Sequence, residues 1–100
     1  MSREVMHIVL FRWNDDVTNE NIASIKKELL NLKDQVNGII DTTVGEDFST
    51  RSKGYHTALC TRFVDKQALL DYGPSAPHQR VVTEFVRPNC SDILAFDYEI

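Results

Sequence analysis

The sequence predicts an α+β domain in which four strands alternate with two helical regions. Three observations lead to this prediction. Segments rich in β-branched and aromatic residues alternate with segments of helical periodicity, polar turns separate them, and a proline-containing break divides the second helical region. The order strand-helix-strand-strand-helix-strand is the ferredoxin-like β-α-β-β-α-β pattern, a four-stranded antiparallel sheet with helices on one face. A chain of 100 residues is expected to form one such domain, residues 1–100, with no room for a second core.

The first half of the chain is expected to form a strand, a helix and a second strand. Residues 5–13 are rich in β-branched and aromatic side chains, which favours a strand. Thr18 is suited to cap a helix that closes at Asn37-Gly38. The helix has one apolar face, formed at three- and four-residue spacing by Ile22, Ile25, Leu29, Leu32 and Val36. Residues 39–46 follow as a strand, and residues 47–54 as a polar loop.

The second half is expected to contain two more strands around a broken helix. Asp65 can cap the short helix, and Gly73-Pro74 must end it, because proline cannot continue a helix. The expected elements are a strand over residues 55–64, a helix over residues 66–72, a helix from Pro77 to the Pro88-Asn89 pair, and a strand over residues 93–98.

Both faces of the first and last strands are apolar. In the first strand Val5, Val9, Phe11 and Trp13 alternate with Met6, Ile8 and Leu10. In the last strand Ile93 and Ala95 alternate with Leu94, Phe96 and Tyr98. Two helices can cover only one face of the sheet, and monomers avoid large exposed apolar patches. We therefore expect a homodimer that forms through the sheet face opposite the helices.

Composition excludes several classes of partner. The net charge of −4 disfavours nucleic acid and anionic membranes, which require a basic surface. The apolar runs are far shorter than the roughly 18 residues of a membrane helix, and the first residues lack the layout of a signal peptide. Cys60 and Cys90 have no metal-ligand spacing, so we expect reduced thiols in a cytoplasmic protein that holds no metal.

The candidate chemical groups are three histidines and their acidic or phenolic neighbours, since no cofactor-binding motif is present. Tyr72 ends the helix before the break and His78 begins the helix after it, so the two could meet over a cavity as an acid/base pair. His7 lies in the first strand, and Asp97 is a suggestive partner because a buried carboxylate needs a donor. His56 is expected to face the dimer interface. A surface or core role without chemistry remains an alternative for each histidine.

Short segments along nearly the whole chain occur in a characteristic order: residues 7–13, Asp16-Val17-Thr18, Gly54-Tyr55-His56-Thr57, Tyr72 with Pro77-His78, and Phe96-Asp97-Tyr98. Together they resemble the stress-responsive dimeric α/β-barrel (Dabb) family. The resemblance implies a ferredoxin-like protomer whose sheet packs into a dimeric α/β barrel across a two-fold axis. One member of the family is a polyketide cyclase that uses aldol condensation without a cofactor, in a cavity between sheet and helices.

The resemblance also assigns roles by position. It implies that Tyr72 and His78 are the catalytic tyrosine and histidine, that Asp97 supports His78, and that His7 lies in the cavity. The expected substrate-binding residues are His7, Val9, Leu29, Thr57 and Leu59.

Three positions depart from the family pattern. The third strand reads His56-Thr57 where the family usually has Thr-His, Leu29 stands at the cyclase's pocket tyrosine, and Ser75-Ala76 replaces His-Pro. These differences imply a cavity less polar than that of the cyclase.

Three functions remain open from the sequence. The first is a cofactor-independent cyclase, lyase or monooxygenase that acts on a small, largely apolar molecule. The second is a non-catalytic stress or ligand-binding protein. The third is haem handling, for which only His78 or His7 could be the axial ligand.

Overall fold

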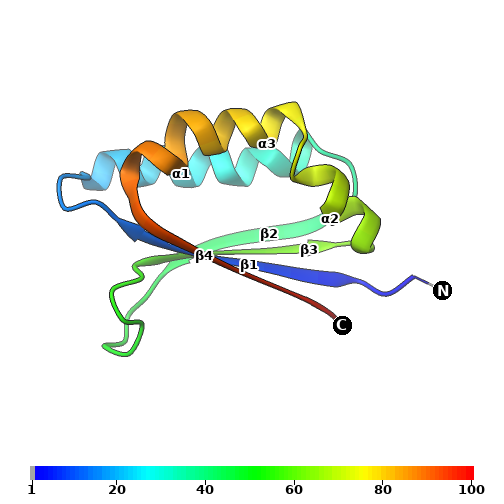
Figure 1. The fold of residues 1–100 in the computed structure, drawn as a ribbon, viewed down its shortest axis with the longest axis horizontal. Helices are drawn as coiled ribbons and strands as arrows, with labels where there is room; N and C mark the ends of the chain where they lie inside the picture. The colour runs from blue at the N-terminus through cyan, green and yellow to red at the C-terminus, as the bar shows by residue number, and fades with distance from the viewer. Residues whose placement is uncertain (1) are drawn as a thin grey trace.

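The computed structural model describes residues 2–100, which form one antiparallel sheet covered by helices. Its regular elements are β1 (Val5–Trp13), α1 (Asn19–Asn31), β2 (Ile39–Glu46), β3 (Thr57–Phe63), α2 (Lys66–Tyr72), α3 (Ala76–Val81) and β4 (Cys90–Glu99). The strand order is β2-β3-β1-β4, and the helices lie together on one face (Figure 1). The predicted ferredoxin-like fold is therefore confirmed.

Helix α1 begins where the sequence predicts, because Thr18 caps it. The Thr18 hydroxyl accepts a hydrogen bond from the Asn21 backbone N–H at 3.1 Å, and the Asn21 side chain accepts one from the Thr18 N–H at 3.2 Å. This reciprocal pair satisfies two backbone donors at the helix start. The regular helix is shorter than its apolar spacing predicts, since it ends at Asn31 and continues only as a 3-10 turn over Leu32–Asp34.

Gly38 allows β2 to begin directly beneath α2. Its φ is +92°, a conformation that residues with side chains rarely adopt. A Cβ atom at this position would lie only 2.6 Å from the Cβ of Ala68. The close approach of the α1–β2 connection to α2 therefore depends on a glycine.

The second helical region is divided as predicted. Asp65 accepts a hydrogen bond from the Ala68 N–H at 2.9 Å and so caps α2, which ends at Tyr72. Helix α3 begins at Ala76, with Pro77 in its first turn. The course after α3 differs from the predicted regular helix, because a π-helical turn over Val82–Val86 and a 3-10 turn over Arg87–Asn89 lead into β4.

Two predicted strands have different limits in the structure. Strand β3 begins at Thr57, so Tyr55 and His56 belong to the preceding loop. Strand β4 begins at Cys90 and is longer than predicted, because the 3-10 turn ends at Asn89 and the polar residues that follow already pair with β1.

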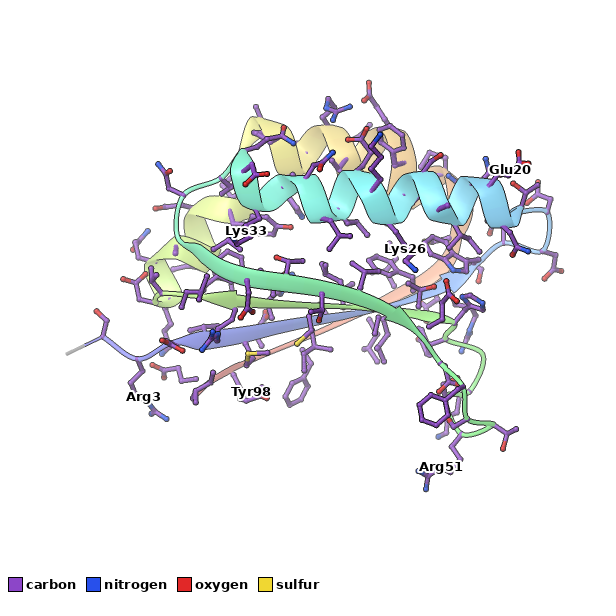
Figure 2. The ribbon with its side chains drawn as sticks, turned by 180° about the vertical axis from the view of Figure 1, so that it is seen from behind. Arg3, Glu20, Lys26, Lys33, Arg51 and Tyr98 are labelled. Carbon is purple, nitrogen blue, oxygen red and sulfur yellow. The ribbon has the colours of Figure 1, made fainter. Side chains whose placement is uncertain are left out.

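The two faces of the sheet differ sharply in exposure. The face toward the helices packs the core around residues such as Val9, Leu59 and Phe63. On the other face Leu94, Phe96 and Tyr98 are exposed, and Tyr98 points away from the helical layer (Figure 2). Within residues 2–100, no helix has both the length and the apolar character needed to cross a membrane.

Candidate active site

A cavity of about 260 Å³ lies between the sheet and the helices. Six residues expected at the site line it: His7, Val9, Leu29, Leu59, Tyr72 and His78. The three apolar members come from β1, α1 and β3, while Tyr72 and His78 approach from the two sides of the helix break. The structure thus brings together six of the eight predicted residues, and the other two, Thr57 and Asp97, lie outside the lining.

Tyr72 and His78 lie against each other, as their places around the break predict. The centres of their rings are 4.3 Å apart, with 46° between the ring planes. Tyr72 is 3% exposed and also packs edge-on against Phe63 and His7. Burial raises the pKa of Tyr72 to about 12. The phenol therefore keeps its proton at neutral pH and can act as a hydrogen-bond donor.

The helix break also holds the imidazole of His78 in one tautomer. His78 Nδ1 donates a hydrogen bond to the Gly73 carbonyl at 2.8 Å, since a carbonyl oxygen can only accept. In a continued helix this carbonyl would bond to the N–H four residues later, but that residue is Pro77, which has none. With Nδ1 protonated, Nε2 of the neutral ring carries the lone pair and can accept a proton.

The protonation state of His78 suits this role. Burial lowers its pKa below the usual value of 6.5, and the neighbouring His7 lowers it further, while the bond to Gly73 opposes the shift. The imidazole is therefore neutral at pH 7 and available as a base.

Asp97 has a different partner from the one implied by the family resemblance. Asp97 Oδ1 accepts a hydrogen bond from His7 Nδ1, whereas His78 is held by a backbone carbonyl. The expectation that Asp97 orients His78 is therefore wrong. His7 and Asp97 lie directly opposite each other in the β1–β4 register, which places their side chains within reach. The Asp97 side chain is also 45% exposed rather than buried, because it lies on the edge strand.

Comparison with known proteins identifies the family. Residues 5–100 match the model of the stress responsive A/B barrel domain, Dabb. The chain belongs to this family. The membership predicted from the ordered sequence segments is thus confirmed.

Three relatives illustrate what this Dabb domain is similar to. A stress-response A/B barrel domain-containing protein of Arabidopsis thaliana is 36% identical over 99 residues, and the match covers 97% of this chain but only 37% of that protein. The hydroxynitrile lyase from Passiflora edulis has a TM-score of 0.90 at 24% identity, covering 100% of this chain and 95% of that one. A dimeric ferredoxin-like protein of unknown function from Thermobifida fusca has a TM-score of 0.86 at 21% identity, covering 100% and 93%. The two solved structures share the fold of this chain.

Thr57 does not line the cavity of this Dabb domain. It is buried beneath Trp13, whose indole N–H donates to Thr57 Oγ1 at 3.0 Å, and its hydroxyl lies 2.8 Å from His56 Nδ1. His56 lies beside Trp13 and Thr57 and also lines a second cavity with Leu10 and Ala58. Its place in the proposed dimer interface stays a prediction.

Six further residues line the cavity although the sequence does not single them out for the site: Phe11, Val82, Val86, Arg87, Ile93 and Ala95. Strand alternation is a signal that could have found Phe11, Ile93 and Ala95, which share sides with His7 and Asp97. No comparable signal predicts Arg87, because a π-helical turn determines where it lies. Among residues 2–100, no group of three or more His, Cys, Asp or Glu side chains is placed to hold a metal ion.

Proposed function

We propose that this Dabb domain is a cofactor-independent acid/base enzyme that makes or breaks a carbon–carbon bond beside a carbonyl group. The observation that carries the proposal is the pairing of a neutral, backbone-anchored His78 with a protonated Tyr72 over one cavity. A base and a hydrogen-bond donor held together in a largely apolar site are the groups that such chemistry needs.

The proposed reaction balances with these two residues alone. His78 Nε2 removes the proton of a hydroxyl group on the substrate. As the carbonyl forms, the adjacent carbon–carbon bond breaks and its electron pair leaves with the departing carbon, as an enolate or cyanide. Tyr72 donates a hydrogen bond to the substrate oxygen, and the imidazolium of His78 returns the proton to the leaving group. The reverse sequence is an aldol-type addition or cyclisation.

His7 is proposed to be a substrate-binding residue at the same end of the cavity. Its imidazole is 12% exposed and is oriented by Asp97, so that Nε2 of the ring remains free for a substrate. Asp97 is therefore a positioning residue for His7 in this proposal, rather than a catalytic partner of His78.

The acting unit is proposed to be a homodimer formed through the sheet face opposite the helices. The exposed apolar side chains of Leu94, Phe96 and Tyr98 on that face support this assembly. The similarly folded Thermobifida fusca protein is described as dimeric.

The first test is cleavage of mandelonitrile, followed as benzaldehyde formation, with diacetone alcohol as a second substrate for retro-aldol cleavage. Replacing the base in His78→Gln is expected to lower kcat/KM about 100-fold or more, in the range of general acid/base contributions. Tyr72→Phe is expected to lower kcat/KM by a smaller factor than His78→Gln does. His56→Gln is the matched control, since it removes a histidine outside the cavity, and it should act like the wild type. A kcat/KM that stays close to the wild-type value in His78→Gln would contradict the proposal.

The alternative is a non-catalytic protein that binds a small apolar ligand. It is favoured by the cavity lining, where aliphatic residues such as Val9, Leu29 and Leu59 outnumber polar ones. Binding of both compounds without turnover of either would support this alternative.

A further inference from the structure

The two ends of the cavity carry different chemical groups. His7, Tyr72 and His78 form the acid/base end. Along β1 and β4 the lining then continues through Val9 and Ala95 to Phe11 and Ile93, which are paired in the strand register. A single charged side chain from the described lining, Arg87, lies at this second end, where the chain enters β4.

The distance between the two ends of the cavity can be estimated from the residue spacing along a strand and, independently, along the helical course. His7 and Phe11 are four positions apart in a strand, which corresponds to about 13 Å. His78 and Arg87 are nine positions apart along the helical course, which also corresponds to about 13 Å. The cavity therefore suits an elongated molecule with its reactive group at one end.

The π-helical turn explains why Arg87 lies on the cavity side. The Arg87 N–H bonds to the Val82 carbonyl, five residues earlier. In an α-helix two residues five positions apart diverge by about 140° around the axis, so Arg87 would face away from the side that Val82 presents. A turn closed by a five-residue bond instead places Arg87 on the same side of the helix as Val82. Both residues consequently line the same cavity.

Arg87 differs from Arg62 and Arg80 in its partners. Arg62 and Arg80 each form ion pairs with two carboxylates. In the part of the chain that the structure describes, Arg87 has neither an ion pair nor a side-chain hydrogen bond. Its guanidinium therefore has its donors available at the end of an apolar cavity, in the planar arrangement that matches a carboxylate.

We propose that Arg87 binds the carboxylate of an elongated, otherwise apolar substrate whose carbonyl end lies at Tyr72 and His78. This inference rests on the proposed function for the reacting end and adds the substrate class, a carboxylic acid with a distant carbonyl or hydroxyl group. A positive charge near the C-terminal end of a helical segment can also stabilise the helix. The test must therefore separate ligand recognition from a structural contribution of the positive charge.

The experiment compares binding of octanoate and octanamide, which have the same chain length but differ in charge, by ¹H–¹⁵N NMR titration of the full chain. For the wild type we expect octanoate to bind about tenfold more tightly than octanamide, with the His78 ring among the perturbed signals. In Arg87→Gln the preference should disappear, while octanamide binds as before. Arg51→Gln changes the net charge equally on the remote β2–β3 loop (Figure 2) and should retain the preference.

Two further outcomes keep this inference separate from the proposed function. Arg87→Lys keeps the helix-end charge but loses the planar fork, and we expect an intermediate preference with unchanged thermal stability. The inference would be overturned if the wild type bound octanoate and octanamide equally tightly. It would also be overturned if Arg87→Gln and Arg51→Gln lost the same amount of octanoate affinity. A carboxylate preference that depends on Arg87 in a protein without turnover would uphold it and reject the proposed reaction.

Discussion

Phe96 offers a direct test of the bare sheet face as a dimer interface. Its side chain is 66% exposed in the protomer, on the side opposite the helices. An aromatic side chain can bury roughly 200 Å², so about 130 Å² of Phe96 is available for a partner to cover. At about 25 cal/mol per Å², covering that area contributes about 3 kcal/mol per copy.

Truncation in Phe96→Ala should remove most of this contribution. We expect a loss of about 2 kcal/mol per copy, or about 4 kcal/mol for a symmetric dimer, which raises the dissociation constant roughly a thousandfold. Sedimentation velocity over a concentration series would measure it, with circular dichroism to check folding. Leu70→Ala is the matched control, because Leu70 is also 66% exposed but lies on α2 in the helical layer. An unchanged dimer in Phe96→Ala, or a wild-type monomer at all concentrations, would refute the reasoning.

Three other predictions concern the site and the fold. The His78 ring should titrate below pH 6.5 by NMR, and because the protonated ring cannot act as a base, kcat/KM should fall as the pH drops through that midpoint. Asp97→Asn should change the ring signals of His7 more than those of His78, since Asp97 bonds to His7. Gly38→Ala should lower the free energy of unfolding by about 1–3 kcal/mol in urea denaturation, because its Cβ would collide with Ala68.

Each of these measurements has a control or a contrary outcome. For His78, the control is the pH dependence of folding. Because its lowered pKa makes the folded state bind protons less readily than the unfolded state, the free energy of unfolding should decrease as the pH falls below 6.5. Larger changes in the ring signals of His78 than in those of His7 in Asp97→Asn would contradict the assigned pairing of Asp97 with His7. Gly45→Ala, where no atom lies within 4 Å of the added Cβ, should cost much less stability than Gly38→Ala.

The sequence predicts the fold well because its signals are local. Alternation places the strands, and the side-chain cap at Thr18 and the Gly73-Pro74 pair determine where helices begin and end. The meeting of Tyr72 and His78 is also predictable, since only a short break separates them. Such features depend on residues close together in the chain.

Two features of the site are not predicted correctly from the sequence or from the family resemblance. The family resemblance pairs Asp97 with His78, although the cross-strand register places it opposite His7. The π-helical turn that directs Arg87 has no recognisable spacing in the sequence, because its five-residue bond leaves the apolar pattern almost unchanged.

The anchoring of His78 by the Gly73 carbonyl has a consequence for how such a site can diversify. The acceptor is a backbone atom that Pro77 leaves without its helical donor and that the Gln79 side chain also bonds, so it does not depend on the identity of the aliphatic lining side chains. Residues such as Leu29, Leu59 and Val82 can therefore be exchanged, and the shape of the cavity altered, while the base keeps its tautomer. New ligand preferences could arise from single substitutions in the lining, without any compensating change at the histidine.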